Sequence, residues 1–246
     1  MFLNETHIHG RDQLLTTIGI TKMTEYPSII NSSKAPHRNC VAFAKIDGSN
    51  FRAKYTKKQG FNLFGSRHEL IDESHKFLGE SVTIFKRDYQ EKLTEFFSKD
   101  KDLRNEREVI VYGEFFGPNS FAGIHQENDP KELIIFDVLV GHKNHWFYKP
   151  ADFIQTFQTL VRIPPVLYLG NMNDKLIDDV RTGVYTPEFH RLTDNKHKLF
   201  EGVVCKGTET RGDFRGKVWM CKIKTNEYFQ ALRNRGGEEW VKKYGE

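Results

Sequence analysis

The chain has 246 residues, of which 38% are hydrophobic and 28% are charged, and its formal net charge is +4 at pH 7. This length is sufficient for one large domain or two small ones with a substantial core. No segment approaches the roughly 18 consecutive apolar residues of a membrane-spanning helix, which excludes an integral membrane protein of that kind. The mild positive charge is compatible with a nucleic-acid partner but does not require one.

The N-terminus and the cysteines bear on localisation. The first ten residues, MFLNETHIHG, have neither a basic n-region nor an apolar h-region, so export is not expected. Three cysteines are present, Cys40, Cys205 and Cys221, and none of them forms a CxxC pair. An odd number without this spacing favours reduced thiols. We therefore predict a cytoplasmic protein without a membrane segment.

Hydrophobic alternation and periodicity predict an α+β fold with antiparallel sheets. In chain order, strands are expected at residues 40–46, 50–55, 61–66, 109–116, 132–140, 201–206 and 218–224. Helices are expected in parts of residues 69–100 and at residues 150–160, 174–180 and 226–244, the last interrupted by Gly236 and Gly237. No repeat or linker divides the sequence, so a single domain over residues 1–246 is expected.

The segment KIDGSN, residues 45–50, follows the first predicted strand and places Lys45, Asp47 and a glycine turn together. A lysine attacks phosphorus only as the neutral amine, although its unperturbed pKa is about 10.4. Nearby positive charge or desolvation lowers that pKa. Lys222 and Lys224 lie two residues apart on a predicted strand, so both project from one face and can supply this charge or bind a phosphate.

Carboxylates and an aromatic residue follow in the next segments. Glu114, in YGEFFG, lies at a strand end beside glycines and can accept a hydrogen bond from a ribose hydroxyl. Phe136, in IIFDV, offers a stacking surface for a base, although the segment taken alone favours a core position. Glu201, in EGVVCK, can hold Mg²⁺ directly or through water. Strict alternation places Glu201 and Lys206 on opposite faces of their strand, so a bulge or twist is needed if both reach one nucleotide.

Two polar residues are candidates for contacts with a polynucleotide. They are Asn50 and Arg67, the latter in FGSR, and arginine suits a terminal phosphate because its guanidinium binds in a bidentate manner.

The ordered series KIDGSN, FGSR, YGEFFG, IIFDV, EGVVCK and MCKIKT resembles motifs I, Ia, III, IIIa, IV and V of the covalent nucleotidyltransferases. That superfamily contains ATP-dependent DNA ligases, RNA ligases and mRNA capping enzymes. Within it, the chain most resembles the type-2 RNA ligases, which include phage and trypanosome editing ligases, so a viral, phage or bacterial origin is plausible. Asn50 favours an RNA ligase, because DNA ligases and capping enzymes usually have arginine there. Asp47 discriminates less, since DNA ligases share it with some RNA ligases.

The resemblance implies a fold and a role for each residue. The fold is an ATP-grasp-like nucleotidyltransferase domain, in which helices flank antiparallel sheets and the nucleotide cleft lies between the sheets. Lys45 becomes the AMP-lysine, Glu114 binds the ribose and Phe136 stacks on adenine. The remaining roles are as follows: Glu201 and Asp47 organise Mg²⁺ or Mn²⁺, Lys222 and Lys224 contact the α-phosphate, Lys206 contacts the nucleotide, and Asn50 and Arg67 lie near the strand ends.

The implied function is an ATP-dependent RNA ligase that joins a 3′-hydroxyl to a 5′-phosphate through a lysyl-AMP intermediate and an adenylylated 5′ end. The expected substrate is RNA, an RNA/DNA hybrid or a nicked duplex, and the expected state is a monomer. A minimal DNA ligase, a hybrid nick-sealing ligase, a capping guanylyltransferase and a non-catalytic binding protein remain alternatives.

The chain departs from the superfamily pattern after motif V. Only 22 residues follow Lys224, which leaves no room for an oligonucleotide-binding-fold domain and is short for the helical C-terminal domain of several RNA ligases. From the sequence we expect a single adenylation domain without an appended domain. Two expectations follow: a naturally minimal ligase, or a ligase that uses a partner protein in place of such a domain.

Overall fold

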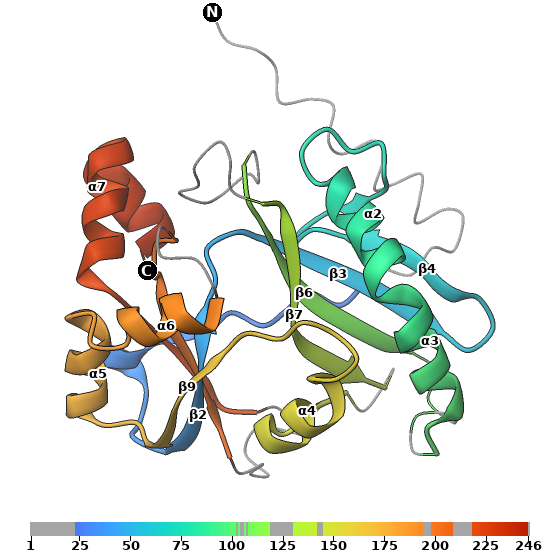
Figure 1. Cartoon of the computed structure of the whole chain (residues 1–246), viewed down its shortest axis with the longest axis horizontal. Coiled ribbons are helices and arrows are strands. Elements are labelled where there is room, and N and C mark those ends of the chain that lie inside the picture. The colour runs from blue at the N-terminus through green and yellow to red at the C-terminus, as the bar shows by residue number, and fades with distance from the viewer. Residues whose placement is uncertain are drawn as a thin grey trace, which may run out of the picture.

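The computed structural model describes residues 23–101, 103, 106, 108–118, 130–141, 145–193, 198–208 and 218–245. These residues form a mixed α+β fold with two sheets that are mostly antiparallel (Figure 1). The prediction of an α+β fold built on antiparallel sheets is therefore confirmed. Within the described part of the chain, no helix is both long and apolar enough to span a membrane.

The first sheet, sheet A, has five strands. Their spatial order is β1 (Ile30–Asn31), β11 (Met220–Lys224), β10 (Gly202–Gly207), β2 (Asn39–Lys45) and β9 (Val166–Asn171). Neighbouring strands are antiparallel, except that β1 runs parallel to β11. Three segments far apart in the sequence thus meet at the centre of this sheet: β2, β10 and β11.

The second sheet, sheet B, has six strands and is antiparallel throughout. Their spatial order is β5 (Leu70–Ile71), β4 (Gly60–Gly65), β3 (Ser49–Thr56), β6 (Val109–Phe116), β7 (Glu132–Val140) and β8 (Trp146–Phe147). Strands β6 and β7 have the predicted bounds, because each is a long run of β-branched and aromatic residues.

The helices lie beside the sheets (Figure 1). Helices α2 (Gly79–Asp88) and α3 (Gln90–Lys99) contact strands β7 and β4 of sheet B, and α5 (Asp174–Arg181) contacts β10 and β11 of sheet A. The others are α4 (Pro150–Phe157), α6 (Thr186–Thr193), α7 (Asn226–Trp240) and the short helical segments η1 (Ser32–Lys34) and η3 (Val241–Gly245). Helix α7 is kinked at Gly236 and Gly237, where the sequence predicts an interruption.

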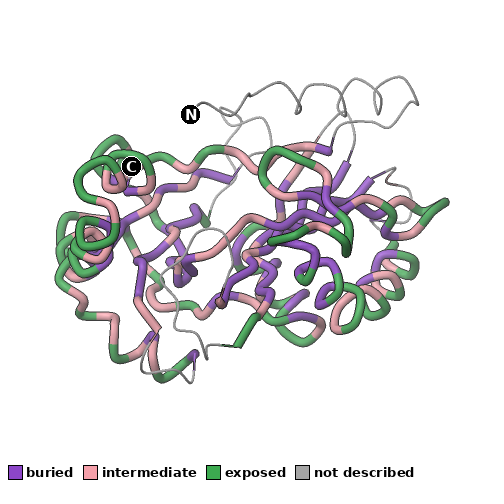
Figure 2. The backbone as a smooth tube through the Cα atoms, turned by 90° about the horizontal axis from the view of Figure 1, so that it is seen from above, coloured by how far each residue is buried: buried purple, intermediate pink, exposed green. Residues whose placement is uncertain are grey.

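Burial follows the two sheets, since most residues of the central strands are buried. Figure 2 shows the buried residues gathered in the interior and the exposed ones at the edges of the molecule. One hydrophobic cluster lies between sheet B and helices α2, α3 and α4, and it is rich in phenylalanine, including Phe51, Phe85 and Phe97. Burial of each such side chain contributes about 1.5–3 kcal/mol. A second cluster lies against sheet A. A third, smaller cluster joins Met23 and Tyr112.

The three cysteines belong to the cluster at sheet A. Cys40, Cys205 and Cys221 are on the neighbouring strands β2, β10 and β11, have free thiols and are fully buried. Cys205 lies directly opposite Cys221 in the ladder. All three therefore pack as small hydrophobic residues of the core.

The turn at residues 46–48 carries the chain from sheet A to sheet B, because β2 ends at Lys45 and β3 begins at Ser49. Gly48 allows this turn to lie against β6, since a Cβ atom there would be 2.4 Å from the carbonyl oxygen of Phe115. Lys45 is therefore the last residue of a central strand, at the point where the two sheets meet.

Candidate active site

Lys45, Glu201 and Lys224 meet at one end of sheet A. Gly202 lies opposite Lys45 on one side and opposite Lys224 on the other, so β2, β10 and β11 place these residues in one row. The Glu201 carboxylate lies between the two lysines, at 2.8 Å from Lys45 Nζ and 2.9 Å from Lys224 Nζ. Lys224 also donates a hydrogen bond to the carbonyl oxygen of Tyr244.

Gly202 explains how Glu201 reaches this position. Its φ angle is +146°, a conformation that favours glycine, and a Cβ atom would be 2.0 Å from the carbonyl oxygen of Ile223. Strand β10 begins only at Gly202, so Glu201 lies outside the regular alternation of the strand. The strict alternation that relates Glu201 to Lys206 in the sequence therefore does not apply to Glu201.

The pKa of Lys45 is raised, whereas the sequence analysis predicts that it is lowered. Burial disfavours the charged amine, but Glu201 and Glu114 outweigh this effect and raise the pKa of Lys45 above its ordinary value. The expected lowering by Lys222 and Lys224 is wrong for this ligand-free arrangement, because Lys224 lies across the Glu201 carboxylate from Lys45. Burial of Glu201 is likewise outweighed by Lys45 and Lys224, which lower the pKa of that carboxyl.

Glu114 and Asp47 bring further negative charge to the same place. Burial, together with the nearby Glu201 and Asp47, raises the pKa of Glu114 to about 8 despite the opposing charge of Lys45. Asp47 is 8% exposed and accepts a hydrogen bond of 3.0 Å from the hydroxyl of Tyr228 on α7. Three carboxyl groups, those of Glu201, Glu114 and Asp47, thus act electrostatically on Lys45.

Lys222 and Arg67 contribute positive charge nearer the surface. Burial, Lys224 and Lys45 lower the pKa of the half-buried Lys222 to about 8. Arg67 follows strand β4, is exposed and lies 3.4 Å from the hydroxyl of Ser28. Both Glu114 and Lys222 feel its charge, so Arg67 belongs to the rim of the same site.

Asn50 lies beside Glu114, since the two residues face each other between β3 and β6. Within the described part of the protein, Asn50 Oδ1 and Ser49 Oγ are buried and have no hydrogen-bond partner. A buried acceptor of this kind is costly unless a ligand or water satisfies it. Asn50 Oδ1, on the residue opposite Glu114, is therefore a candidate contact for a polar ligand group.

Phe136 and Lys206 form a second part of the site. Phe136 is half-buried, and its ring lies 4.9 Å from that of Tyr26 and 6.5 Å from that of Tyr112. Lys206 Nζ donates hydrogen bonds to the carbonyl oxygen of Phe136 at 2.7 Å and to Asp137 at 2.9 Å. Lys206 is thus bonded to the strand that carries Phe136 and lies apart from the row of Lys45 and Lys224.

Three contributors to the site were missed by the sequence analysis. Tyr228 contacts Asp47, and Tyr26 donates a hydrogen bond of 2.8 Å to Asp137. Asp137 in turn is buried and binds Lys206. The sequence analysis predicted no contact for any of these three residues. The only signal in the sequence is Thr225, a capping residue three positions before Tyr228, which indicates that this tyrosine lies in the first turn of a helix.

Asp47 and Glu201 offer carboxylate oxygens, the type of ligand that Mg²⁺ and Mn²⁺ prefer. Within the described residues, no three His, Cys, Asp or Glu side chains are arranged to bind a metal on their own. A site completed by phosphate oxygens fits this arrangement.

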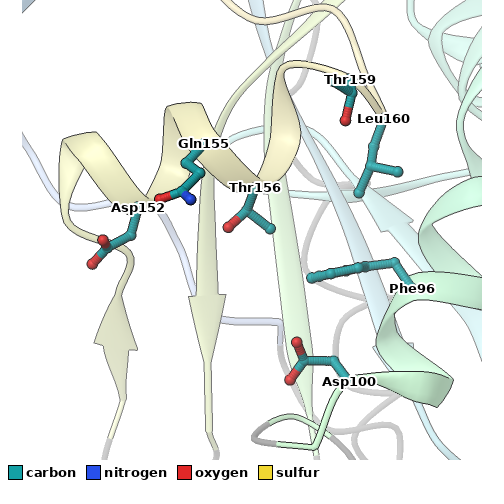
Figure 3. Close-up of a pocket in the computed structure, with 7 residues that line it drawn as sticks. All are labelled: Phe96, Asp100, Asp152, Gln155, Thr156, Thr159 and Leu160. Atoms are coloured by element: carbon teal, nitrogen blue, oxygen red, sulfur yellow. The ribbon is translucent and has the colours of Figure 1, made fainter.

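A separate groove lies between α3 and α4 (Figure 3). Its lining consists of Phe96, Asp100, Asp152, Gln155, Thr156, Thr159 and Leu160. None of the residues that the sequence singled out lines it, so the groove is distinct from the row at Lys45.

Comparison with known proteins gives a consistent result. The sequence profile described as RNA ligase matches residues 38–223, whereas a comparison with the curated proteins found no match. Among solved structures, a Naegleria gruberi RNA ligase variant with AMP and Mn matches with a TM-score of 0.60 and 15% identity, covering 87% of this chain and 59% of that chain. A variant with ATP and Mn matches with a TM-score of 0.55 and 16% identity, covering 91% and 68%.

At these identities the structural matches show a shared fold, and this chain spans 59% of the length of the first of those ligase chains. The profile match is of a different kind, because it extends over most of the sequence and includes all of the residues in the row at sheet A except Lys224. On that match, the chain belongs to the RNA ligase family.

Proposed function

We propose that the protein is an ATP-dependent RNA ligase that works through a lysyl-AMP intermediate. The observation that carries this proposal is the row formed by Lys45, Glu201 and Lys224, in which a lysine at a strand end is held by a buried carboxylate. Membership of the RNA ligase family supports it. The AMP, ATP and Mn in the Naegleria structures support an adenine nucleotide and a divalent cation.

In the first step, Lys45 Nζ attacks the α-phosphorus of ATP, a phosphoramidate forms and pyrophosphate leaves. The attacking amine must be neutral, so the proton that Glu201 stabilises on Lys45 has to be lost when ATP binds. Lys222 and Lys224 are on β11, which β10 separates from the strand of Lys45, and they balance the charge of the α-phosphate. The contribution of these residues is mainly to position and to stabilise charge.

The nucleotide has complementary contacts on the side of sheet B. Glu114 accepts from a ribose hydroxyl, and the half-buried ring of Phe136 stacks on adenine. Lys206 fixes the backbone of Phe136 through its carbonyl oxygen, which holds the ring in place. Lys206 thereby affects nucleotide binding indirectly, through its contacts with Phe136 and Asp137.

A divalent cation would be held by Glu201 and Asp47 together with phosphate oxygens. When bound, it neutralises the phosphates and lowers the attraction between Lys45 and the surrounding carboxylates.

The later steps use the rim of the site. The AMP moves from Lys45 to the 5′-phosphate of a polynucleotide, which restores the free amine and forms a 5′–5′ pyrophosphate linkage. A 3′-hydroxyl then attacks the phosphorus of the former 5′-phosphate, and AMP leaves. Arg67 is exposed, so its guanidinium can donate to the phosphate at the strand end, whereas the unsatisfied Asn50 Oδ1 can accept a hydrogen bond from a hydroxyl of the substrate.

A self-labelling assay tests the proposal. The protein is incubated with α-phosphate-labelled ATP or GTP and Mg²⁺ and then analysed on a denaturing gel, with Lys45→Ala alongside. We expect label from ATP that is absent in the variant. Label from GTP alone would indicate capping chemistry, and label that survives in Lys45→Ala would remove Lys45 from its role.

Substrate choice is tested once labelling is established. Nicked RNA, nicked DNA and hybrid duplexes are compared under the same conditions, and we expect RNA ends to be joined. Preferential sealing of all-DNA nicks would assign the protein to DNA rather than RNA joining.

A further inference from the structure

Helix α7 enters the active site through one side chain, that of Tyr228. This tyrosine is 4% exposed and its hydroxyl donates a hydrogen bond of 3.0 Å to Asp47 Oδ1. Its ring centroid lies 4.9 Å from Lys224 Nζ. One residue near the C-terminus therefore contacts both the turn that follows Lys45 and the last lysine of strand β11.

Hydrogen bonds through Thr225 connect Tyr228 to Phe200 and Glu201 and hold it in position. The Thr225 side chain accepts a hydrogen bond of 3.0 Å from the Tyr228 amide and donates one of 2.8 Å to the carbonyl oxygen of Phe200. The Thr225 amide donates to the carbonyl oxygen of Glu201 at 2.9 Å. The first turn of α7 therefore cannot move without disturbing residues 200 and 201.

Asp47 has a reason to need this support. It lies in the turn at residues 46–48, two residues beyond Lys45, and its charge acts on both Lys45 and Glu114. An aspartate in a turn has several side-chain rotamers, and a hydrogen bond from a buried hydroxyl to the carboxylate selects one of them.

We propose that Tyr228 is a positioning residue for nucleotidyl transfer, in that it holds the Asp47 carboxylate in one orientation beside Lys45 while its ring covers Lys224. This inference rests on the proposed function, because Lys45 is taken as the nucleophile. It gives α7 a role in the first chemical step that none of the sequence motifs assigns to it.

The test begins with Tyr228→Phe, which removes the hydroxyl and keeps the ring against Lys224. We expect the rate of single-turnover self-labelling at saturating ATP to fall about tenfold, because the hydrogen bond to a charged group is lost. The ATP concentration that gives half the maximal rate should change by less than twofold. The inference would be overturned if the maximal labelling rate did not fall, or if only the ATP concentration that gives half the maximal rate changed.

Tyr89→Phe is the matched control. Its hydroxyl is also partly buried and donates a hydrogen bond of 2.7 Å to the carbonyl oxygen of Leu133, outside the row at Lys45. Both variants should lower the thermal midpoint to a similar extent, whereas only Tyr228→Phe should slow labelling. Equal slowing in the two variants would show that general loosening of the fold is responsible.

A double-mutant cycle separates positioning from a merely structural role. In the Asp47→Ala background the acceptor is gone, so adding Tyr228→Phe should change the labelling rate by less than twofold. A further tenfold loss would mean that Tyr228 acts independently of Asp47 and would overturn the inference. If the wild-type protein does not label, the proposed function itself fails; if it labels and Tyr228→Phe labels equally fast, only the inference fails.

Discussion

Glu201 has the most constrained environment in the site, because its carboxylate is buried and serves two lysines at once. Removing one partner of a buried ion pair leaves the remaining charges uncompensated. We predict that Glu201→Ala lowers the free energy of unfolding by roughly 3 kcal/mol and abolishes self-labelling. Denaturant unfolding monitored by circular dichroism measures the first effect.

Glu188→Ala provides the control for this prediction. Glu188 forms an exposed pair with Arg191 on α6, and such surface pairs contribute about 1 kcal/mol or less. A similar loss of stability in both variants would contradict the special position of Glu201.

Glu114 makes the stability of the ligand-free protein depend on pH. Between its ordinary pKa of 4.5 and its raised pKa of about 8, the folded protein retains a proton that the unfolded chain has lost. The contribution of Glu114 to stability is therefore full below pH 4.5 and decreases as the pH rises through 8, by at most about 1.4 kcal/mol per unit.

We accordingly predict that Glu114→Gln loses less stability between pH 5.5 and pH 8.5 than the wild-type protein does. Unfolding free energies measured at four or five pH values in that range check the difference in slope. If the unfolding free energies of the two proteins changed with pH in parallel, the pKa of Glu114 would not be raised in the folded protein.

At the scale of the elements, the start of β10 determines the geometry of the row. Gly202 combines a positive φ angle with close contact to Ile223, so any side chain meets both strain and a steric clash. We predict that Gly202→Ala lowers the free energy of unfolding by about 2 kcal/mol or more and prevents Glu201 from bridging the lysines. Thermal unfolding and self-labelling of Gly202→Ala, compared with Gly60→Ala, measure these effects.

The comparison with Gly60→Ala is informative because Gly60 also has a positive φ angle but no atom close to its Cβ position. This control carries the backbone strain without the clash. If Gly60→Ala proved as damaging as Gly202→Ala, the contact with Ile223 would not be the reason for the glycine.

The central elements were predictable from the sequence, whereas the peripheral ones were not. Strands β6 and β7 and helix α5 carry long or clearly amphipathic patterns. Strand β9 was missed because it is a sheet edge with little burial, so hydrophobic alternation is weak. Helix α6 was also missed, although Pro187 lies in its first turn, where proline is favoured.

The site was predictable as a set of residues but not as a set of contacts. The motifs singled out Lys45, Glu201 and Lys224, yet alternation along a single strand does not reveal that three strands align them in one row. The raised pKa of Lys45 also depends on this pairing, which is why the expected lowering was wrong. Contacts such as that of Tyr228 with Asp47 join residues 181 positions apart and leave no local signal.

At the scale of the whole molecule, three connections bind the two sheets together beside the site. One is the turn at residues 46–48 between β2 and β3. Another is the segment before β1, in which Tyr26 packs on Phe136 of sheet B, and β1 itself pairs with β11 of sheet A. The third is the hydrogen bond and ion pair that join Lys206 of β10 to residues of β7. Relative movement of the sheets is therefore restricted near the row at Lys45.

The buried cysteines have a practical consequence. Cys40, Cys205 and Cys221 lie on the three strands that carry or flank the row at Lys45, and none of their side chains is accessible in the folded protein. An alkylating reagent reaches them only when sheet A opens, so the rate of native-state alkylation measures the frequency of that opening. A nucleotide that bridges these strands should slow the reaction, which provides an internal assay of ligand binding that needs no introduced probe.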